Sequence, residues 1–368
     1  MTGRETGYIK RAVRSGKISG NGMFTKKCQS FFEERYGFRK ALLTTSCTDA
    51  LEMAAILCNV GPGDEVIVPS YTFVSTALAF VRQGAKIVFA DSRPDEPNID
   101  VGKIEALVTT KTKVIVPVHY AGVACDMDAI MDIARRHNLL VVEDAAQAID
   151  SYYIGKDGTK RPLGSIGHLG CFSFHETKNI ISGEGGLLAI NDERFASRAE
   201  IIWEKGTNRS QFFRGEVNKY GWVDTGSSFL PSEIVAAFLW AQLENLEDIQ
   251  AKRISHWNRY CRAIAPLADK LGCRMPLIPS YATNNAHMFY LVFKNLAQRS
   301  GFIAYMKDRG ILPVFHYLSL HASPFYAPRH DGRILSQSDR YSDCLVRLPM
   351  YYDLPVDSVV RTIEDYCK

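Results

Sequence analysis

Short apolar runs alternate with helix-like segments over the first half of the chain, and this alternation constrains the fold more than any other feature. Four runs have the length and composition of buried strands: EVIVP (65–69), KIVFAD (86–91), KVIVPVHY (113–120) and LLVVEDAA (139–146). Longer segments with helical spacing of apolar residues lie between them, such as DMDAIMDIARRHN (126–138). The alternation predicts an α/β fold with a mainly parallel sheet covered by helices on both faces. Ligands bind at the carboxyl ends of the strands in such sheets.

The remaining segments predict a lead-in before this sheet and a second, smaller domain after it. Two helices are expected near the N-terminus, over 8–15 and 25–36, and further helices over 193–204 and 231–267. The polar and aromatic stretch 206–228 is too long for an ordinary connection, which indicates a functional or interface loop. From about residue 272 a strand (288–293), a helix (302–309) and a histidine-rich stretch (313–326) follow. We predict a large domain over 1–250 and a small C-terminal α+β domain over 251–368.

Composition excludes several classes of function. Lysine and arginine number 44 against 40 aspartates and glutamates, and no basic run or basic amphipathic stretch occurs, so neither nucleic acid nor a membrane surface is an expected partner. The slight excess of positive charge favours an anionic substrate. The nine cysteines are scattered without a CxxC pair or metal-ligand spacing, so we predict no metal site. We expect a cytoplasmic protein, because no apolar segment resembles a signal peptide or reaches transmembrane length.

One lysine is the main candidate for chemistry. In GCFSFHETKNIISGEGG (170–186) an apolar strand-like run leads into polar residues around Lys178, and the glycines that follow permit a tight turn. An ordinary surface lysine would keep its charge in water. A lysine in a desolvated pocket loses its proton more easily and can form a Schiff base with a carbonyl or with pyridoxal phosphate. The second interpretation requires a phosphate cradle, an aromatic side chain that stacks on the ring and a carboxylate.

Other strand ends offer these partners. SCTDALEMAA (46–55) places small polar residues at a helix start, where they either cap the helix or bind a phosphate. Phe73 follows the strand 65–69 and either joins the core or stacks on a flat ring. Asp144 ends a buried strand, where a carboxylate needs a cation such as a protonated pyridine nitrogen, although a helix cap is an alternative. Gln147, one helical turn further on, could face the same ligand.

Ser173 and His175 flank the lysine itself. Side chains of this kind could bind phosphate or transfer protons, although a single histidine is more often structural.

The segments SCTDALEMAA, PSYTFVST, PVHYAG, VVEDAAQA and FSFHETKN with GEGG occur in the order and spacing of one family. The chain resembles the sugar aminotransferases of the DegT/DnrJ/EryC1/StrS family over essentially its whole length. This resemblance implies a fold-type-I enzyme with a seven-stranded sheet and pyridoxal 5'-phosphate as cofactor. It makes Lys178 the lysine that binds the cofactor and acts as catalytic base, Asp144 the partner of the ring nitrogen and Phe73 the stacking residue. Gln147 would contact the phenolic oxygen. The implied phosphate and further cofactor contacts are Ser46, Cys47, Thr48, Ser173, His175 and Ser228.

The resemblance also implies a reaction. The expected substrates are dTDP-4-keto-6-deoxyglucose and L-glutamate, and the expected product is dTDP-4-amino-4,6-dideoxygalactose for bacterial surface polysaccharide synthesis. The alternatives are 4-amino-4,6-dideoxyglucose, a 3-amino sugar, or a non-aminating reaction on a sugar. Arg209 and Arg214 are candidates for the anionic nucleotide, with exposed loop arginines as the alternative. His316, Tyr317 and His321 are candidates for the sugar. A homodimer or higher homo-oligomer is expected.

One departure from the family pattern concerns the oligomer. Many members carry GYNYR, whose asparagine reaches the partner subunit's cofactor phosphate, and this chain has GSSFL (226–230), with Ser228 as the possible substitute.

Three rival functions lack support in the sequence. Related sugar 3-dehydratases carry histidine where Lys178 stands, and a regulator without turnover should have lost Lys178 or Asp144. A nicotinamide enzyme needs GxGxxG after its first strand, and none follows.

Overall fold

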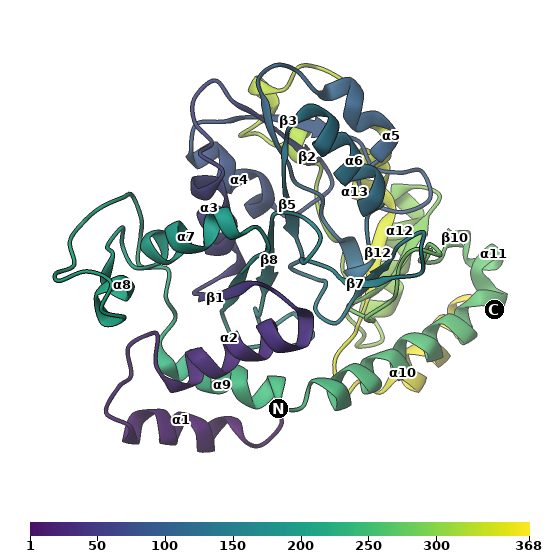
Figure 1. Cartoon of the computed structure of the whole chain (residues 1–368). Helices are drawn as coiled ribbons and strands as arrows, with labels where there is room; N and C mark the ends of the chain where they lie inside the picture. The colour runs from purple at the N-terminus through teal and green to yellow at the C-terminus, as the bar shows by residue number, and fades with distance from the viewer.

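The computed structural model describes residues 1–368, and its centre is a seven-stranded sheet (Figure 1). The strands lie in the order β1 (Lys40–Thr44), β9 (Gly186–Ile190), β8 (Leu169–Ser173), β5 (Leu140–Asp144), β4 (Thr112–Ile115), β2 (Glu65–Pro69) and β3 (Lys86–Ala90). Neighbours from β8 to β3 are parallel, and β9 runs antiparallel to both β1 and β8. The predicted mainly parallel, seven-stranded α/β fold is confirmed.

Two of these strands do not belong to the predicted alternation. Gly186 was expected in a turn and the first predicted strand begins at residue 65, whereas β1 and β9 pair with each other at one edge of the sheet. No helix separates β9 from β8, so the strand–helix pattern does not reveal β9, and β1 lies before the first run that the sequence identified as a strand. Strands β8 and β9 form a hairpin in which Ser173 lies opposite Gly186. Lys178 therefore sits in the loop of a hairpin at the sheet edge where β5 also ends.

Helices cover both faces of the sheet. One face carries α3 (Cys47–Leu57), α4 (Val74–Arg82) and α7 (Ala196–Trp203), which pack with a buried cluster that includes Val66 and Val68. The opposite face carries α2 (Met23–Tyr36), α6 (Met127–His137) and α9 (Glu233–Leu243), in a cluster that includes Ile67. Successive residues of a strand point to opposite faces, which is why these neighbours belong to different clusters. Figure 1 shows α3, α4 and α7 on one side of β5 and α6 on the other.

The N-terminal lead-in and the long helical segment differ in detail from the prediction. The two lead-in helices exist as α1 (Glu5–Arg14) and α2, and α1 packs on α9. The long helical segment expected over 231–267 consists of two α-helices, because α9 ends at Leu243 and α10 (Leu246–Ile264) begins three residues later. Asn245 breaks the helix there: its side-chain amide donates to the carbonyl of Ala241 at 2.8 Å, and its backbone leaves the helical region.

The C-terminal third forms an antiparallel sheet with its own buried cluster. Strands β10 (Cys273–Arg274), β11 (Phe289–Phe293) and β12 (Leu345–Leu348) are covered by α10, α12 (Leu296–Lys307) and α14 (Val356–Tyr366). The smaller elements are α5 (Val101–Ile104), β6 (Tyr152–Ile154), β7 (Lys160–Pro162), α8 (Arg209–Phe213), α11 (Ala268–Leu271) and α13 (Ser336–Cys344). Helix α10 crosses residue 250 without a break, and the division after that residue stays a proposal. No helix combines the length and apolarity needed to cross a bilayer.

Candidate active site

Lys178 lies in the β8–β9 loop with a free ammonium group. The backbone N–H of Lys178 donates to the carbonyl of His175 at 2.9 Å, which closes a turn and fixes the start of the side chain. Burial lowers the pKa of Lys178, the charge of Arg347 lowers it further, and Cys47 and Asp144 oppose the shift. No hydrogen bond or ion pair stabilises the ammonium form. A lysine in this state is a better nucleophile and base than one in water.

Asp144 ends β5 and is 5% exposed. Its carboxylate accepts hydrogen bonds from Thr76 Oγ1 at 2.7 Å and from the N–H of Ala146 at 3.1 Å. Burial raises the pKa of Asp144, while those two hydrogen bonds and the charge of Lys178 lower it. A buried carboxylate with no ion pair is complementary to a protonated ring nitrogen. The donor set around Asp144 therefore fits the pyridine nitrogen of the predicted cofactor.

The start of α3 forms the predicted anion site. Ser46 Oγ caps the N–H of Asp49 at 3.1 Å, which leaves the N–H groups of Cys47 and Thr48 without acceptors inside the helix. A side chain at Gly186 would place its Cβ 2.3 Å from the carbonyl carbon of Ser46, so β9 and α3 meet closely. Since Ser173 lies opposite Gly186 in the hairpin, its hydroxyl is beside the same helix start. This cradle fits a phosphate.

Phe73 and Gln147 lie next to the aromatic stretch that follows β11. Phe73 is 55% exposed, and its ring centroid lies 6.1 Å from that of Tyr317. A largely exposed phenylalanine at a strand end is available for stacking on a ligand. Gln147 Oε1 accepts from the N–H of Ala121 at 2.6 Å, and Gln147 Nε2 donates to the hydroxyl of Tyr317 at 2.9 Å. These bonds orient the amide and leave one Nε2 hydrogen for a ligand oxygen.

The three aromatic candidates for the sugar end separate in the structure. His316 stacks on Tyr317 with ring centroids 3.5 Å apart and bonds the hydroxyl of Tyr120 at 2.7 Å. Burial lowers the pKa of His316 well below its usual value, and the charges of Arg347 and Lys178 add to this effect. His321 lies elsewhere, because its Nδ1 is 2.7 Å from Ser70 Oγ. The structure thus brings His316 and Tyr317, and not His321, to the surroundings of Lys178.

The side chains of four further candidates form no hydrogen bond or ion pair with Lys178. His175 is half-buried, and its ring contacts Thr177 Oγ1 at 2.9 Å. Ser228 is exposed and pairs with Glu204 through the backbone. Arg214 forms ion pairs with Glu200 and Glu216, and Arg209 lies over the ring of Phe213. Figure 1 shows the loop around α8 projecting from the body, on the side opposite α12 and β12.

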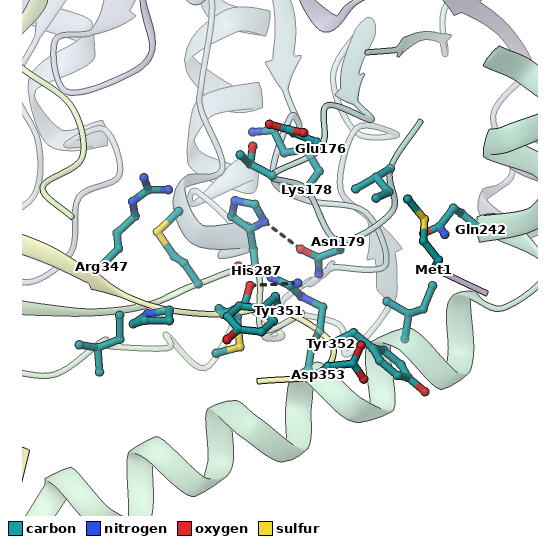
Figure 2. A pocket seen from close by; sticks show the side chains of 18 of the residues that line it. Met1, Glu176, Lys178, Asn179, Gln242, His287, Arg347, Tyr351, Tyr352 and Asp353 are labelled. Atoms are coloured by element: carbon teal, nitrogen blue, oxygen red, sulfur yellow. Dashed lines mark hydrogen bonds between the residues drawn. The ribbon is translucent and has the colours of Figure 1, made fainter. Parts of the chain in front are cut away.

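A cavity of about 580 Å³ opens beside Lys178. It is bordered by the 176–181 loop, by α9 and α10, by His287 and Met288 before β11, and by residues 347–353 at β12. Figure 2 shows Lys178, His287 and Arg347 together at one end of the cavity, with Tyr352 and Asp353 at the other end. Asp144, Phe73 and the start of α3 do not line it. The cavity and the predicted cofactor contacts therefore meet at Lys178.

Asn179 and His287 are site residues that the sequence analysis missed. Asn179 Nδ2 donates to Gln250 Oε1 at 2.8 Å and to the carbonyl of Asn285 at 2.9 Å, so Asn179 Oδ1 is the atom that accepts from His287 Nδ1 at 2.8 Å. His287 is buried, and burial lowers its pKa well below the usual value. His287 is therefore neutral, with the lone pair on Nε2. Asn179 directly follows Lys178, and a polar residue next to the lysine was the only sequence signal for it.

A model of the DegT/DnrJ/EryC1/StrS aminotransferase family matches residues 1–365. The chain belongs to this family. Its members are sugar aminotransferases that depend on pyridoxal 5'-phosphate, so the predicted family, enzyme class and cofactor are confirmed. The match extends over nearly the whole chain. It includes the segments between residues 46 and 186 that carried the resemblance in the sequence.

Individual relatives support the same assignment. The chain is 34% identical over 334 residues to the GDP-perosamine synthase of Caulobacter vibrioides, covering 89% of this chain and 85% of the relative. It is 32% identical to the spore coat polysaccharide biosynthesis protein SpsC of Bacillus subtilis, covering 98% and 93%. The fold matches S. venezuelae DesV, solved in complex with a ketimine intermediate, with a TM-score of 0.88 at 28% identity, covering 100% and 95%.

Proposed function

We propose that this sugar aminotransferase transfers the amino group of L-glutamate to the keto carbon of a dTDP-4-keto-6-deoxyhexose, giving dTDP-4-amino-4,6-dideoxygalactose for bacterial surface polysaccharide synthesis. The observation that carries the proposal is the unpaired, half-buried Lys178 in the hairpin loop at the edge of the sheet where Asp144 ends β5, beside the anion site at α3. The choice of this product is supported by the resemblance of five segments, PSYTFVSTALAF, PVHYAGVACDMD, CFSFHETKN, EKGTNRSQFFRGEV and NAHMFY, to enzymes that make it.

Each residue has a separate task in the proposed reaction. Bound pyridoxal phosphate supplies an electrophilic carbonyl and an electron-withdrawing ring. Lys178 Nζ takes the proton from the donor's alpha carbon in the first half-reaction and returns a proton to the sugar carbon in the second. Asp144 holds the proton on the ring nitrogen, and Phe73 covers one ring face. The N–H groups of Cys47 and Thr48, with the hydroxyl of Ser173, bind the phosphate.

Replacement of Lys178 with alanine tests the covalent role. Lys178→Ala should abolish turnover and remove the near-visible absorbance of covalently held cofactor, because no other lysine borders the same cavity. Absorbance spectra of the purified protein with added pyridoxal phosphate measure this directly. Lys252→Met, on the exposed surface of α10, should change neither property. Retention of both turnover and absorbance in Lys178→Ala would contradict the assignment.

A GDP-linked sugar is the second candidate substrate, because the name of the Caulobacter relative specifies GDP. The two substrates differ in the base and in the ribose, so the nucleotide pocket decides between them. Single-turnover measurements with dTDP- and GDP-4-keto-6-deoxyhexoses should show faster amination of the dTDP sugar. NMR of the product then assigns the position and the axial or equatorial orientation of the new amine, and an equatorial amine or amination at C3 would favour the alternative products.

We also propose a homodimer or a higher homo-oligomer in the cytoplasm. The projecting loop carries Arg209 and Ser228, neither of which reaches Lys178 in its own chain, and this arrangement supports their action in the site of a second copy. Arg214 is held by Glu200 and Glu216, so it would bind a nucleotide only after exchange of those ion pairs. All nine cysteines are free thiols, which is consistent with a reducing compartment.

A further inference from the structure

The guanidinium of Arg347 lacks a partner in a molecule whose other enclosed arginines are paired. Arg347 Nε is buried and makes no hydrogen bond, and the side chain takes part in no ion pair. Arg253, which borders the same cavity, instead donates to the carbonyls of Ala286 at 3.2 Å and His287 at 2.6 Å. A buried donor left without an acceptor costs free energy. The free energy is recovered when an acceptor arrives, and for a guanidinium the best acceptor is a carboxylate or a phosphate.

The backbone holds Arg347 firmly in this position. Arg347 lies in the middle of β12, opposite Tyr290 of β11, and its N–H and C=O both bond Val314, at 2.8 and 3.1 Å. Strand pairing on both sides prevents the residue from turning away from the cavity. Figure 2 shows the side chain on the same side of the cavity as Lys178 and His287. Two cationic side chains therefore border one part of the cavity, and the backbone of one of them is held by strand pairing.

The acidic side chains of the cavity do not neutralise these cations. Glu176, Asp248 and Asp353 border the cavity, but none forms an ion pair with Arg347 or Lys178. Asp248 accepts a hydrogen bond from the hydroxyl of Tyr352 at 2.6 Å, at the far end. The positive charge next to Lys178 is therefore available to a ligand.

We propose that the cavity is the amino-donor subsite and that Arg347 binds the donor's alpha-carboxylate. This inference rests on the proposed aminotransfer from an alpha-amino acid. The reacting amine and the alpha-carboxylate of such a donor are attached to the same carbon, so the group that binds the carboxylate must lie near Lys178, as Arg347 does. The diphosphate of a sugar nucleotide lies at the other end of the sugar from the keto carbon. The cofactor phosphate has its own cradle at the start of α3.

The experiment compares Arg347→Gln with Arg361→Gln in the cofactor-loaded enzyme. Arg361 is an exposed arginine on α14 and outside the cavity. Stopped-flow absorbance follows the glutamate half-reaction from the pyridoxal form and the keto-sugar half-reaction from the pyridoxamine form. Arg347→Gln should lower kcat/KM for L-glutamate about 30-fold or more, the effect of a lost charge-assisted hydrogen bond pair. The keto-sugar half-reaction should change by less than about threefold. Arg361→Gln should change neither.

Binding to the cofactor-free protein gives a second measurement that does not depend on turnover. Titration calorimetry with 2-oxoglutarate, the keto acid formed from the donor, should show affinity reduced about 30-fold in Arg347→Gln and partly restored in Arg347→Lys, which keeps the charge and loses the planar fork. An equal loss in both half-reactions, a larger loss with the sugar nucleotide, or unchanged 2-oxoglutarate affinity would overturn the inference. Failure of the proposed function looks different, because the unsubstituted protein would then show no half-reaction with glutamate.

Discussion

Lys178 and Asp144 each sit where the protein disfavours their charge. Burial is the main cause in both cases, and it lowers the pKa of the lysine and raises that of the carboxyl group. Neither residue forms an ion pair with the other, although each charge shifts the other's pKa toward the ionised form. Two opposite charges that are close and not joined leave room for a molecule between them. Pyridoxal phosphate meets both demands, with a carbonyl for the amine and a basic nitrogen for the carboxyl group.

The lowered pKa of Lys178 predicts a pH-dependent cost to the cofactor-free fold. A folded-state pKa below the usual value of 10.5 means that the unfolded chain binds the proton more tightly. The charged lysine therefore lowers the free energy of unfolding. This loss of stability is largest at pH values below the folded-state pKa, and it disappears as the pH rises towards 10.5. Lys178→Met should be more stable than the unsubstituted protein at pH 7, and the difference should shrink by pH 10.

Urea unfolding of the cofactor-free protein at pH 7, 8.5 and 10 measures this difference. Lys252→Met is the matched control, because Lys252 is exposed on α10 and its replacement should give a difference that does not change with pH. A constant stability difference for Lys178→Met across the range would contradict the predicted effect of burial.

Residue types at strand ends were predictable, and contacts between distant residues were not. Lys178, Asp144 and Phe73 follow apolar strands directly, and the parallel pattern implies that such ends meet. Arg347 lies on β12 and His287 just before β11, about 200 and 140 residues after Asp144 along the chain, and no local pattern connects them to Lys178. His321 shows that closeness in the sequence does not place side chains together: it follows His316 by five residues, and its ring faces Ser70.

At the scale of elements, one carboxylate joins α9 to the start of α2. Glu233, 2% exposed in the first turn of α9, accepts hydrogen bonds from the N–H groups of Gly22, Phe24 and Thr25 at 3.0, 2.7 and 2.9 Å. A side chain at residue 22 would collide with Glu233, because its Cβ would lie 2.5 Å from the carboxyl carbon of Glu233. An acidic group beside three N–H groups at a helix start supplies the acceptors that the helix lacks.

Glu233→Ala should therefore destabilise the protein by about 3 kcal/mol, since it leaves three buried N–H groups without acceptors. Glu233→Gln keeps one acceptor oxygen and should cost less. Urea unfolding measures both, and Glu247→Ala is the control, because Glu247 is 82% exposed in a surface ion pair and should change stability by less than about 0.5 kcal/mol. Equal stability of Glu233→Ala and the control would show that the carboxylate does not hold α2.

The helices and strands that the sequence predicted are those in which the apolar residues recur at the spacing of a helix or a strand. Helices α2 and α6 and strands β2, β3, β4 and β5 lie where the spacing of apolar residues predicted them. Strands β1 and β9 form only because they pair with each other and with β8, and Gly186 is needed because β9 passes against the start of α3. The break between α9 and α10 depends on a single asparagine side chain, which no hydrophobic pattern records.

At the scale of the whole molecule, one projecting loop exposes aromatic side chains that nothing in the same chain covers. The loop around α8 projects from the body and exposes Phe213 by 69% and Trp222 by 84%, beside Tyr220 and Val223. Exposed aromatic groups of this kind mark interaction sites. Two predicted site residues, Arg209 and Ser228, lie on the same loop and away from Lys178 in their own chain. A second copy of the chain that receives this loop would bury the aromatic groups and gain both residues.

Loss of these two aromatic groups should separate the copies. Phe213→Ser with Trp222→Ser should shift the protein towards monomer in sedimentation velocity and lower kcat at least about tenfold, because the loop would no longer complete the partner's site. Trp222 bonds only the carbonyl of Asp224 within its chain, so the fold itself should persist. Ile334→Ser, at a residue that is 86% exposed outside the loop, is the control and should leave mass and rate unchanged. A fully active monomer, or an intact oligomer with full activity in the double variant, would show that the loop does not serve a neighbouring site.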